Sequence, residues 1–173
     1  MSNPSFDPYA LLEALAQERF GYVVVGAFAR VVQGSAETTH GLDIVPSMRD
    51  DSLRRLVRVL EDLEAAAKGK LLRPDQRVGA ERLVLRTRAG ELSVVPVPWG
   101  TRGYDDLRIR ANRENLGRGL RPAIASVVDL ARMLEASPRT DDLERLQRLQ
   151  RMMELERRLA RDRRLQRGLG IER

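Results

Sequence analysis

The sequence predicts an α/β domain over residues 1–137, followed by a helical arm over residues 138–173. A run of β-branched and aromatic residues at 22–25 ends at a glycine, which is typical of a short buried strand. Two apolar runs on either side of a polar turn within residues 83–97 predict a β-hairpin. Glycine and proline are absent from residues 141–167, where Leu and Met recur every three or four positions, and this predicts one long helix.

Four shorter helices are predicted before the arm, over residues 8–18, 27–32, 50–67 and 126–136. Pro8 suits the first turn of a helix, because the N–H that proline lacks would have no helical partner there. The acidic pair Asp50 and Asp51 favours the start of the third helix. Ser126, with Asp129 three residues later, predicts an N-cap for the fourth.

A second strand is expected within residues 39–46. Because side chains alternate along a strand, Leu42 and Ile44 would point into the core while Gly41 and Asp43 share the opposite face. Two other segments are expected to be irregular: residues 68–79 form a loop or weak strand, and the Pro- and Gly-rich residues 96–103 form a loop.

The chain of 173 residues carries a formal net charge of +6, and 29 of its 31 basic residues are arginines. The charge is uneven, with a net −2 over residues 1–70 and a net +8 over residues 71–173. A polyanion such as RNA would therefore be attracted mainly to the C-terminal part, where planar guanidinium groups suit phosphate. A simple solvated basic surface is the alternative interpretation.

Several classes of protein are excluded by composition. The chain has no cysteine, which excludes disulfides, thiolate metal sites and Cys nucleophiles. Its one histidine, His40, excludes a metal site built on several histidines. No apolar run approaches the ~20 residues of a membrane span, and the N-terminal residues lack the features of a signal peptide. We therefore expect a cytoplasmic protein that does not contact a membrane.

The segment between residues 23 and 46 carries the most informative motif, with the members Gly26, Ala29, Gly34, Thr39, Gly41, Asp43, Ile44 and Val45. It resembles the nucleotidyltransferase fold of the polymerase-β type, a mixed sheet flanked by helices. The form of the motif is similar to that of the AbiEii-like and MenT-like toxins of bacterial toxin–antitoxin systems. Residues 98–107 and 125–136 resemble later segments of the same family, so the likeness covers residues 20–145.

The resemblance implies a Mg²⁺-dependent enzyme that transfers nucleotides from a nucleoside triphosphate to an RNA end, most plausibly the acceptor end of tRNA. It assigns metal binding to Asp43 and contacts with the triphosphate to Gly26 and Thr39, with Arg139 helping to hold the nucleotide. It also implies neutralisation by a cognate antitoxin protein or by phosphorylation.

Two positions depart from the family pattern. Gly41 stands where active relatives carry the first catalytic Asp, and Ser93 stands where a third carboxylate is common. Glu91 would face the same side of a regular strand and is an alternative ligand. The chain is either a natural degenerate relative or a form from which the catalytic Asp was removed, and we favour the second because the rest of the motif is intact. In both cases this form is expected to be inactive or impaired.

The alternative function is a catalytically degenerate fold that acts as a protein-interaction or nucleic-acid-binding module. Arginines of the arm could follow an RNA backbone, although interleaved carboxylates also fit a solvated helix face. Four apolar residues of the arm are expected to be buried against the domain or against a second protomer, which leaves a homodimer open: Leu146, Leu149, Met153 and Leu155.

Overall fold

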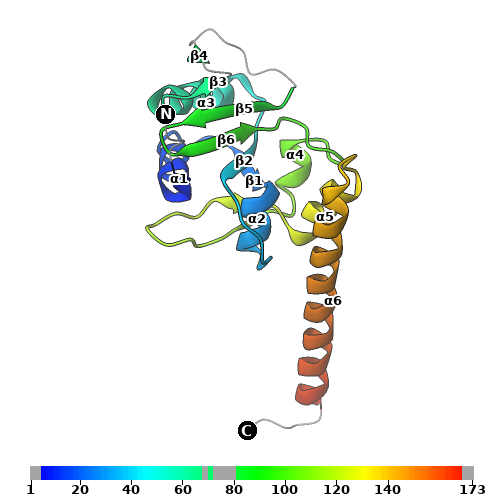
Figure 1. The fold of residues 1–173 in the computed structure, drawn as a ribbon. Helices are drawn as coiled ribbons and strands as arrows, with labels where there is room; N and C mark the ends of the chain where they lie inside the picture. The colour runs from blue at the N-terminus through cyan, green and yellow to red at the C-terminus, as the bar shows by residue number, and fades with distance from the viewer. Residues whose placement is uncertain (1–4, 68–69, 72–80, 169–173) are drawn as a thin grey trace.

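The computed structural model describes residues 5–67, 70–71 and 81–168, and its centre is an eight-stranded mixed sheet in the order β4-β3-β5-β6-β2-β1-β8-β7 (Figure 1). The strands are β1 (Tyr22–Val25), β2 (Gly41–Pro46), β3 (Ala66–Ala67), β4 (Lys70–Leu71), β5 (Leu83–Thr87), β6 (Gly90–Val94), β7 (Asn112–Arg113) and β8 (Ala123–Ile124). The expected α/β class with a mixed sheet is confirmed.

The middle of the sheet is the antiparallel pair β1 and β2, which β8 and β6 extend on either side as parallel neighbours. Val23, Val24 and Val25 of β1 are all buried, as expected for a strand covered on both faces. On β2 the predicted alternation holds, since Leu42 and Ile44 are both 0 % exposed.

The described residues form six helices beside this sheet: α1 (Pro8–Gln17), α2 (Gly26–Val32), α3 (Asp50–Asp62), α4 (Tyr104–Leu107), α5 (Val127–Glu135) and α6 (Asp141–Gly168). Helices α1 and α3 lie together at one side of the sheet, and α6 projects from the other (Figure 1). The predicted cap of α5 is confirmed, because Ser126 Oγ accepts a hydrogen bond from the Asp129 N–H at 3.1 Å.

The third helix is shorter than the sequence pattern predicts, ending at Asp62 rather than near residue 67. Glu64 adopts a left-handed conformation (φ 52°), which stops the helix. Ala66 then pairs with Arg86 of β5, so tertiary strand pairing overrides the local helix propensity of the alanines. Of the segment expected to be a loop or weak strand, β4 is described and the rest lies outside the described residues.

The segment after β6 also differs from expectation. Strand β6 ends at Val94 rather than at residue 97. After the loop comes a single-turn helix, α4, which the sequence pattern does not predict. Four residues are too few to show helical periodicity, and the glycines and prolines before them point to a loop.

Helix α6 has a buried beginning and an exposed end. Leu146 and Leu149 are buried in the core beside α5, and Met153 is half-buried. Leu155 is 58 % exposed, so it is not buried against the domain, and its burial against a second protomer remains a prediction. The last turns of α6 project away from the body (Figure 1). The division into residues 1–137 and 138–173 remains a prediction.

In the part of the chain that the structure describes, no helix is long and apolar enough to cross a bilayer.

Replacing Leu149 with Ala should lower the free energy of unfolding by about 2–5 kcal/mol, because a fully buried leucine leaves a cavity. Leu159, which lies on the same helix but is 45 % exposed, supplies the matched control. Its replacement with Ala should cost less than about 0.5 kcal/mol. Urea denaturation of both variants tests this, and equal losses would contradict the packing described for α6.

Candidate active site

Asp43 lies where β1 ends and α2 begins. Its Cα is paired with that of Val25, the last residue of β1, and Gly26 follows directly. Gly26 has a φ of +72°, and a Cβ added there would lie 2.0 Å from Asp43 Oδ2. A residue with a side chain would therefore be strained and would also displace the carboxylate. The motif glycine is required because the motif aspartate packs against it.

A cavity of about 450 Å³ opens beside this carboxylate and is called the Asp43 cavity. Its walls are the end of β1, the start of α2, the loop after β6, helix α5 and the first turns of α6. Its charged lining residues are Arg30, Asp43, Arg82, Arg139, Asp142 and Arg145. Four guanidinium groups face two carboxylates, so the cavity is suited to an anionic ligand of nucleotide size.

Two of the carboxylates near the cavity are committed to arginines. Glu37 accepts two hydrogen bonds from Arg30, both at 2.9 Å. Burial alone would raise the pKa of Glu37, but these bonds and the charge of Arg30 outweigh it and lower that pKa. Asp142 is buried too, and hydrogen bonds from Ser137 and Arg145 outweigh that burial and lower its pKa. Both carboxylates are therefore ionised at neutral pH.

Arg139 and Trp99 form one rim of the Asp43 cavity. The guanidinium carbon of Arg139 lies 5.2 Å from the centre of the Trp99 ring, within the range of a cation–π contact. Of the residues expected to contact a nucleotide, Gly26 and Arg139 both line the cavity. Thr39 is not among the lining residues of this cavity, and its hydroxyl donates a 2.8 Å hydrogen bond to the Gly41 carbonyl.

Arg82 is a site residue that sequence reasoning missed. Its Nη2 lies 3.5 Å from Asp43 Oδ1 and 3.3 Å from Ser93 Oγ. Arg82 directly precedes β5, and no local pattern distinguishes it from the other arginines. It lies near Asp43 because the sheet places β5, β6 and β2 side by side. The carboxylate therefore has a positive neighbour supplied by the protein itself.

The positions that depart from the family pattern meet on one face of the sheet. In the parallel pair β2 and β6, Gly41 is opposite Glu91 and Asp43 is opposite Ser93. Residues paired in this way present their side chains to the same face, so Glu91 shares a face with Asp43. Among the described residues no group of three His, Cys, Asp or Glu side chains is placed to hold a metal ion.

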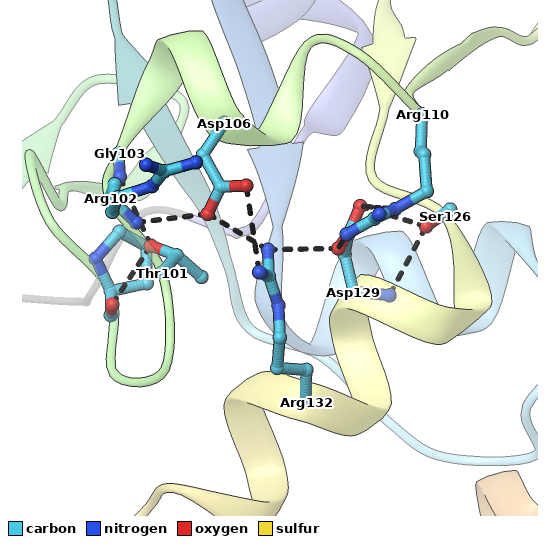
Figure 2. A network of polar contacts seen from close by, with 9 residues as sticks. Thr101, Arg102, Gly103, Asp106, Arg110, Ser126, Asp129 and Arg132 are labelled. Carbon is cyan, nitrogen blue, oxygen red and sulfur yellow. Dashed lines mark hydrogen bonds and ion pairs between the residues drawn. The ribbon is translucent and has the colours of Figure 1, made fainter.

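A polar network holds the wall of the cavity that contains Trp99. Figure 2 shows Arg132 of α5 between Asp106 of α4 and Asp129 of its own helix, at 3.0 and 2.9 Å. Asp106 also accepts a 3.0 Å hydrogen bond from the Arg102 N–H, which ties down the loop between β6 and α4. This backbone bond, aided by Arg132, lowers the pKa of Asp106. Asp129, which is 0 % exposed, is held in turn by Arg110.

Replacing Gly26 with Ala should destabilise the protein more than replacing Gly117 with Ala. Both glycines have a positive φ (+72° and +84°), but nothing lies within 4 Å of a Cβ at Gly117. Gly117→Ala should therefore cost only the backbone strain, about 1–2 kcal/mol. Gly26→Ala should cost about 1–3 kcal/mol more, because it crowds Asp43. Thermal unfolding measures the difference, and equal losses would mean that Asp43 does not pack as described.

Comparison with family models and with curated proteins finds no match. Two solved structures are similar in fold. One is TM1012 of Thermotoga maritima, described as a candidate nucleotidyltransferase, with a TM-score of 0.52 and 14 % identity over 88 % of this chain and 89 % of that one. The other is the antibiotic-resistance factor ANT(2'')-Ia, with a TM-score of 0.55 and 14 % identity over 92 % of each chain. The chain therefore has the fold of the nucleotidyltransferases.

Proposed function

We propose that this chain binds a nucleoside triphosphate in the Asp43 cavity and derives from an enzyme that transfers nucleotides to an RNA end, with the acceptor end of tRNA as the expected substrate. The observation that carries the proposal is the placement of the Asp43 carboxylate against Gly26, at the edge of a cavity lined by four arginines. Positive groups hold the oxygens of a triphosphate, and a carboxylate near the α-phosphate would serve to hold the metal ion that assists transfer.

Within this cavity Arg139 lies beyond the end of α5, where it can contact phosphate oxygens. Arg145, at the start of α6, adds positive charge but is paired with Asp142 at 2.6 Å. Arg139 is exposed, so it can turn toward a ligand. Arg30 is fixed by Glu37 and contributes a rigid wall rather than a free charge. The exposed face of Trp99 is available to a nucleotide base.

The donor set of this form does not fit a pair of Mg²⁺ ions. Two ions that clamp the attacking and leaving oxygens need several carboxylates, because Mg²⁺ prefers hard oxygen ligands in near-octahedral geometry. Here Gly41 offers no side chain, Ser93 offers a hydroxyl, and Arg82 lies beside the oxygen of Asp43. We therefore propose impaired transfer for this sequence and assign Mg²⁺ dependence to the form with Asp at position 41.

A second function is favoured by the position of Arg82. A guanidinium near Asp43 and Ser93 supplies positive charge where metal ions act in active relatives. A chain arranged in this way would act without catalysis, as a protein-interaction or nucleic-acid-binding module. The interaction module is therefore the alternative that the next experiment distinguishes.

Gly41→Asp should raise nucleotide incorporation into total tRNA by orders of magnitude, because it adds a carboxylate on the face that holds Asp43 and Glu91. Without a divalent ion these carboxylates repel one another, so Mg²⁺ should raise the melting temperature of the Gly41→Asp protein more than that of the original chain. Labelled triphosphates and differential scanning fluorimetry measure the two effects.

Gly41→Ala is the steric control for this experiment. A Cβ at position 41 would lie 3.0 Å from the Glu91 carbonyl oxygen, so any side chain shifts β6 slightly. Gly41→Ala should stay inactive, and so should the double variant Gly41→Asp with Asp43→Ala. A folded Gly41→Asp protein that is inert with all four triphosphates would favour the interaction module.

The toxin role is proposed from the resemblance alone, and bacterial growth tests it separately. Expression of the Gly41→Asp form in a bacterial cytoplasm should arrest growth, whereas the original sequence should not. A cognate antitoxin protein would then be identified by its ability to restore growth to that strain.

The projecting end of α6 is the proposed RNA contact. Residues 154–168 are all exposed and contain six arginines and three carboxylates. Of these, Arg158 and Glu154 form an ion pair at 2.5 Å, but both are more than half exposed, so the pair adds little stability. A helix without tertiary contacts is marginal by itself, and a bound polyanion would stabilise it.

Changing four arginines of this arm to Gln should weaken tRNA binding. If each arginine contacts one phosphate, the slope of log binding constant against log salt concentration should become shallower by up to about 3. The variant combines Arg157→Gln, Arg158→Gln, Arg161→Gln and Arg164→Gln. The matched control removes four exposed arginines elsewhere: Arg49, Arg54, Arg86 and Arg88. Filter binding across a salt series gives the slopes, and equal slopes in the two variants would leave the arm as a structural or dimerising element.

A further inference from the structure

A second cavity lies at the opposite end of β1 from Asp43, and it is called the Tyr22 cavity. Its volume is about 400 Å³, close to the 450 Å³ of the Asp43 cavity. The end of α1, the start of β1, helix α4 and the hairpin of β7 and β8 form its walls. Tyr22 and Val25 are three residues apart in β1, so the two cavities are separated by roughly 10 Å of strand.

The Tyr22 cavity is lined by four arginines from four segments of the chain: Arg19, Arg108, Arg113 and Arg121. No Asp or Glu is among its described lining residues. Arg108 pairs at 2.9 Å with the exposed Asp105, and the other three form no ion pair in the described part of the chain. Four like charges around one opening repel each other unless an anion is bound.

Arg19 reaches this cavity from an unfavourable backbone conformation. Its φ is +48°, a region in which residues other than glycine are uncommon. Arg55 of α3 holds this turn, donating to the carbonyls of Glu18 and Arg19 at 3.2 and 2.9 Å. The turn is thus braced by a second arginine, and Arg19 is one of the residues that line the cavity.

Aromatic rings complete the walls. Phe20 and Tyr22 pack together with ring centres 5.2 Å apart. Tyr104 lies over Gly21, where an added Cβ would be 2.5 Å from its hydroxyl oxygen. Burial, partly opposed by the charge of Arg113, raises the pKa of Tyr22 to about 12. The phenol therefore keeps its proton at neutral pH and can donate a hydrogen bond to an anionic oxygen.

We propose that the Tyr22 cavity is a second binding site, separate from the Asp43 cavity, for a small phosphate-bearing ligand of about mononucleotide size. Guanidinium forks pair with phosphate oxygens in two parallel hydrogen bonds, and the aromatic wall suits a flat ring attached to the phosphate. A cavity of about 400 Å³ matches a small ligand better than an extended nucleic-acid backbone.

The test uses the full chain with tripolyphosphate and AMP as probes, in low salt without divalent ions. Calorimetric titrations compare the original protein with Arg113→Gln/Arg121→Gln, two exposed arginines of the Tyr22 cavity. The matched control is Arg54→Gln/Arg88→Gln, which removes the same charge from exposed positions outside both cavities. Fluorescence of Trp99, the one tryptophan of the chain, reports binding at the Asp43 cavity in parallel.

We expect Arg113→Gln/Arg121→Gln to weaken a calorimetric binding event at least about tenfold, as the loss of charge-assisted hydrogen bonds predicts, without changing the Trp99 titration. The control pair should change neither. These binding measurements do not depend on transferase activity, so they test the Tyr22 cavity separately from the experiment with Gly41→Asp.

Three outcomes would overturn the proposal. The first is an unchanged calorimetric curve in Arg113→Gln/Arg121→Gln, and the second is an equal loss in the control pair. The third comes from a single-stranded RNA octamer titrated in the same way. If only the octamer depends on Arg113 and Arg121, while neither small probe binds at the Tyr22 cavity, these arginines serve a nucleic-acid backbone instead.

Discussion

The antiparallel pairing of β1 with β2 is the interaction on which the rest of the structure depends. It places Val25 opposite Asp43, and so brings the carboxylate against Gly26 at the point where β1 becomes α2. Because side chains alternate along a strand, a shift of this register by one residue would turn Asp43 into the core and Leu42 out of it. Both cavities lie at the ends of β1, so the same pairing positions both.

The arginines around this strand pair have three different roles. Arg30 and Arg132 are held by carboxylates and stiffen the walls of the Asp43 cavity. Arg82 lies beside Asp43 itself, where it supplies positive charge. Arg113 and Arg121 line the Tyr22 cavity and have no described carboxylate partner, so their charge is available to a ligand. The net charge of +6 is thus less informative than the place of each arginine.

The similarity to TM1012 and ANT(2'')-Ia supports the fold, and the residues of the site bear on the chemistry. On that face of the sheet Gly41 and Ser93 provide no carboxylate, while Glu91 and Asp43 do. A nucleotidyltransferase fold is therefore combined with a donor set that is too small for two metal ions. This mismatch is what makes position 41 the informative position for the function of the chain.

The sequence alone determined the features that depend on local spacing. The α/β class, the Ser126 cap and the shared face of Gly41 and Asp43 all follow from residues close together in the chain, and the same is true of the motif glycine Gly26. Only the tertiary structure decided the end of α3, where strand pairing of Ala66 overrides helix propensity. The tertiary structure also placed Arg82 beside Asp43 and brought arginines from four segments to the Tyr22 cavity. These contacts join residues far apart in the chain, so they depend on the strand order of the sheet, which no local pattern encodes.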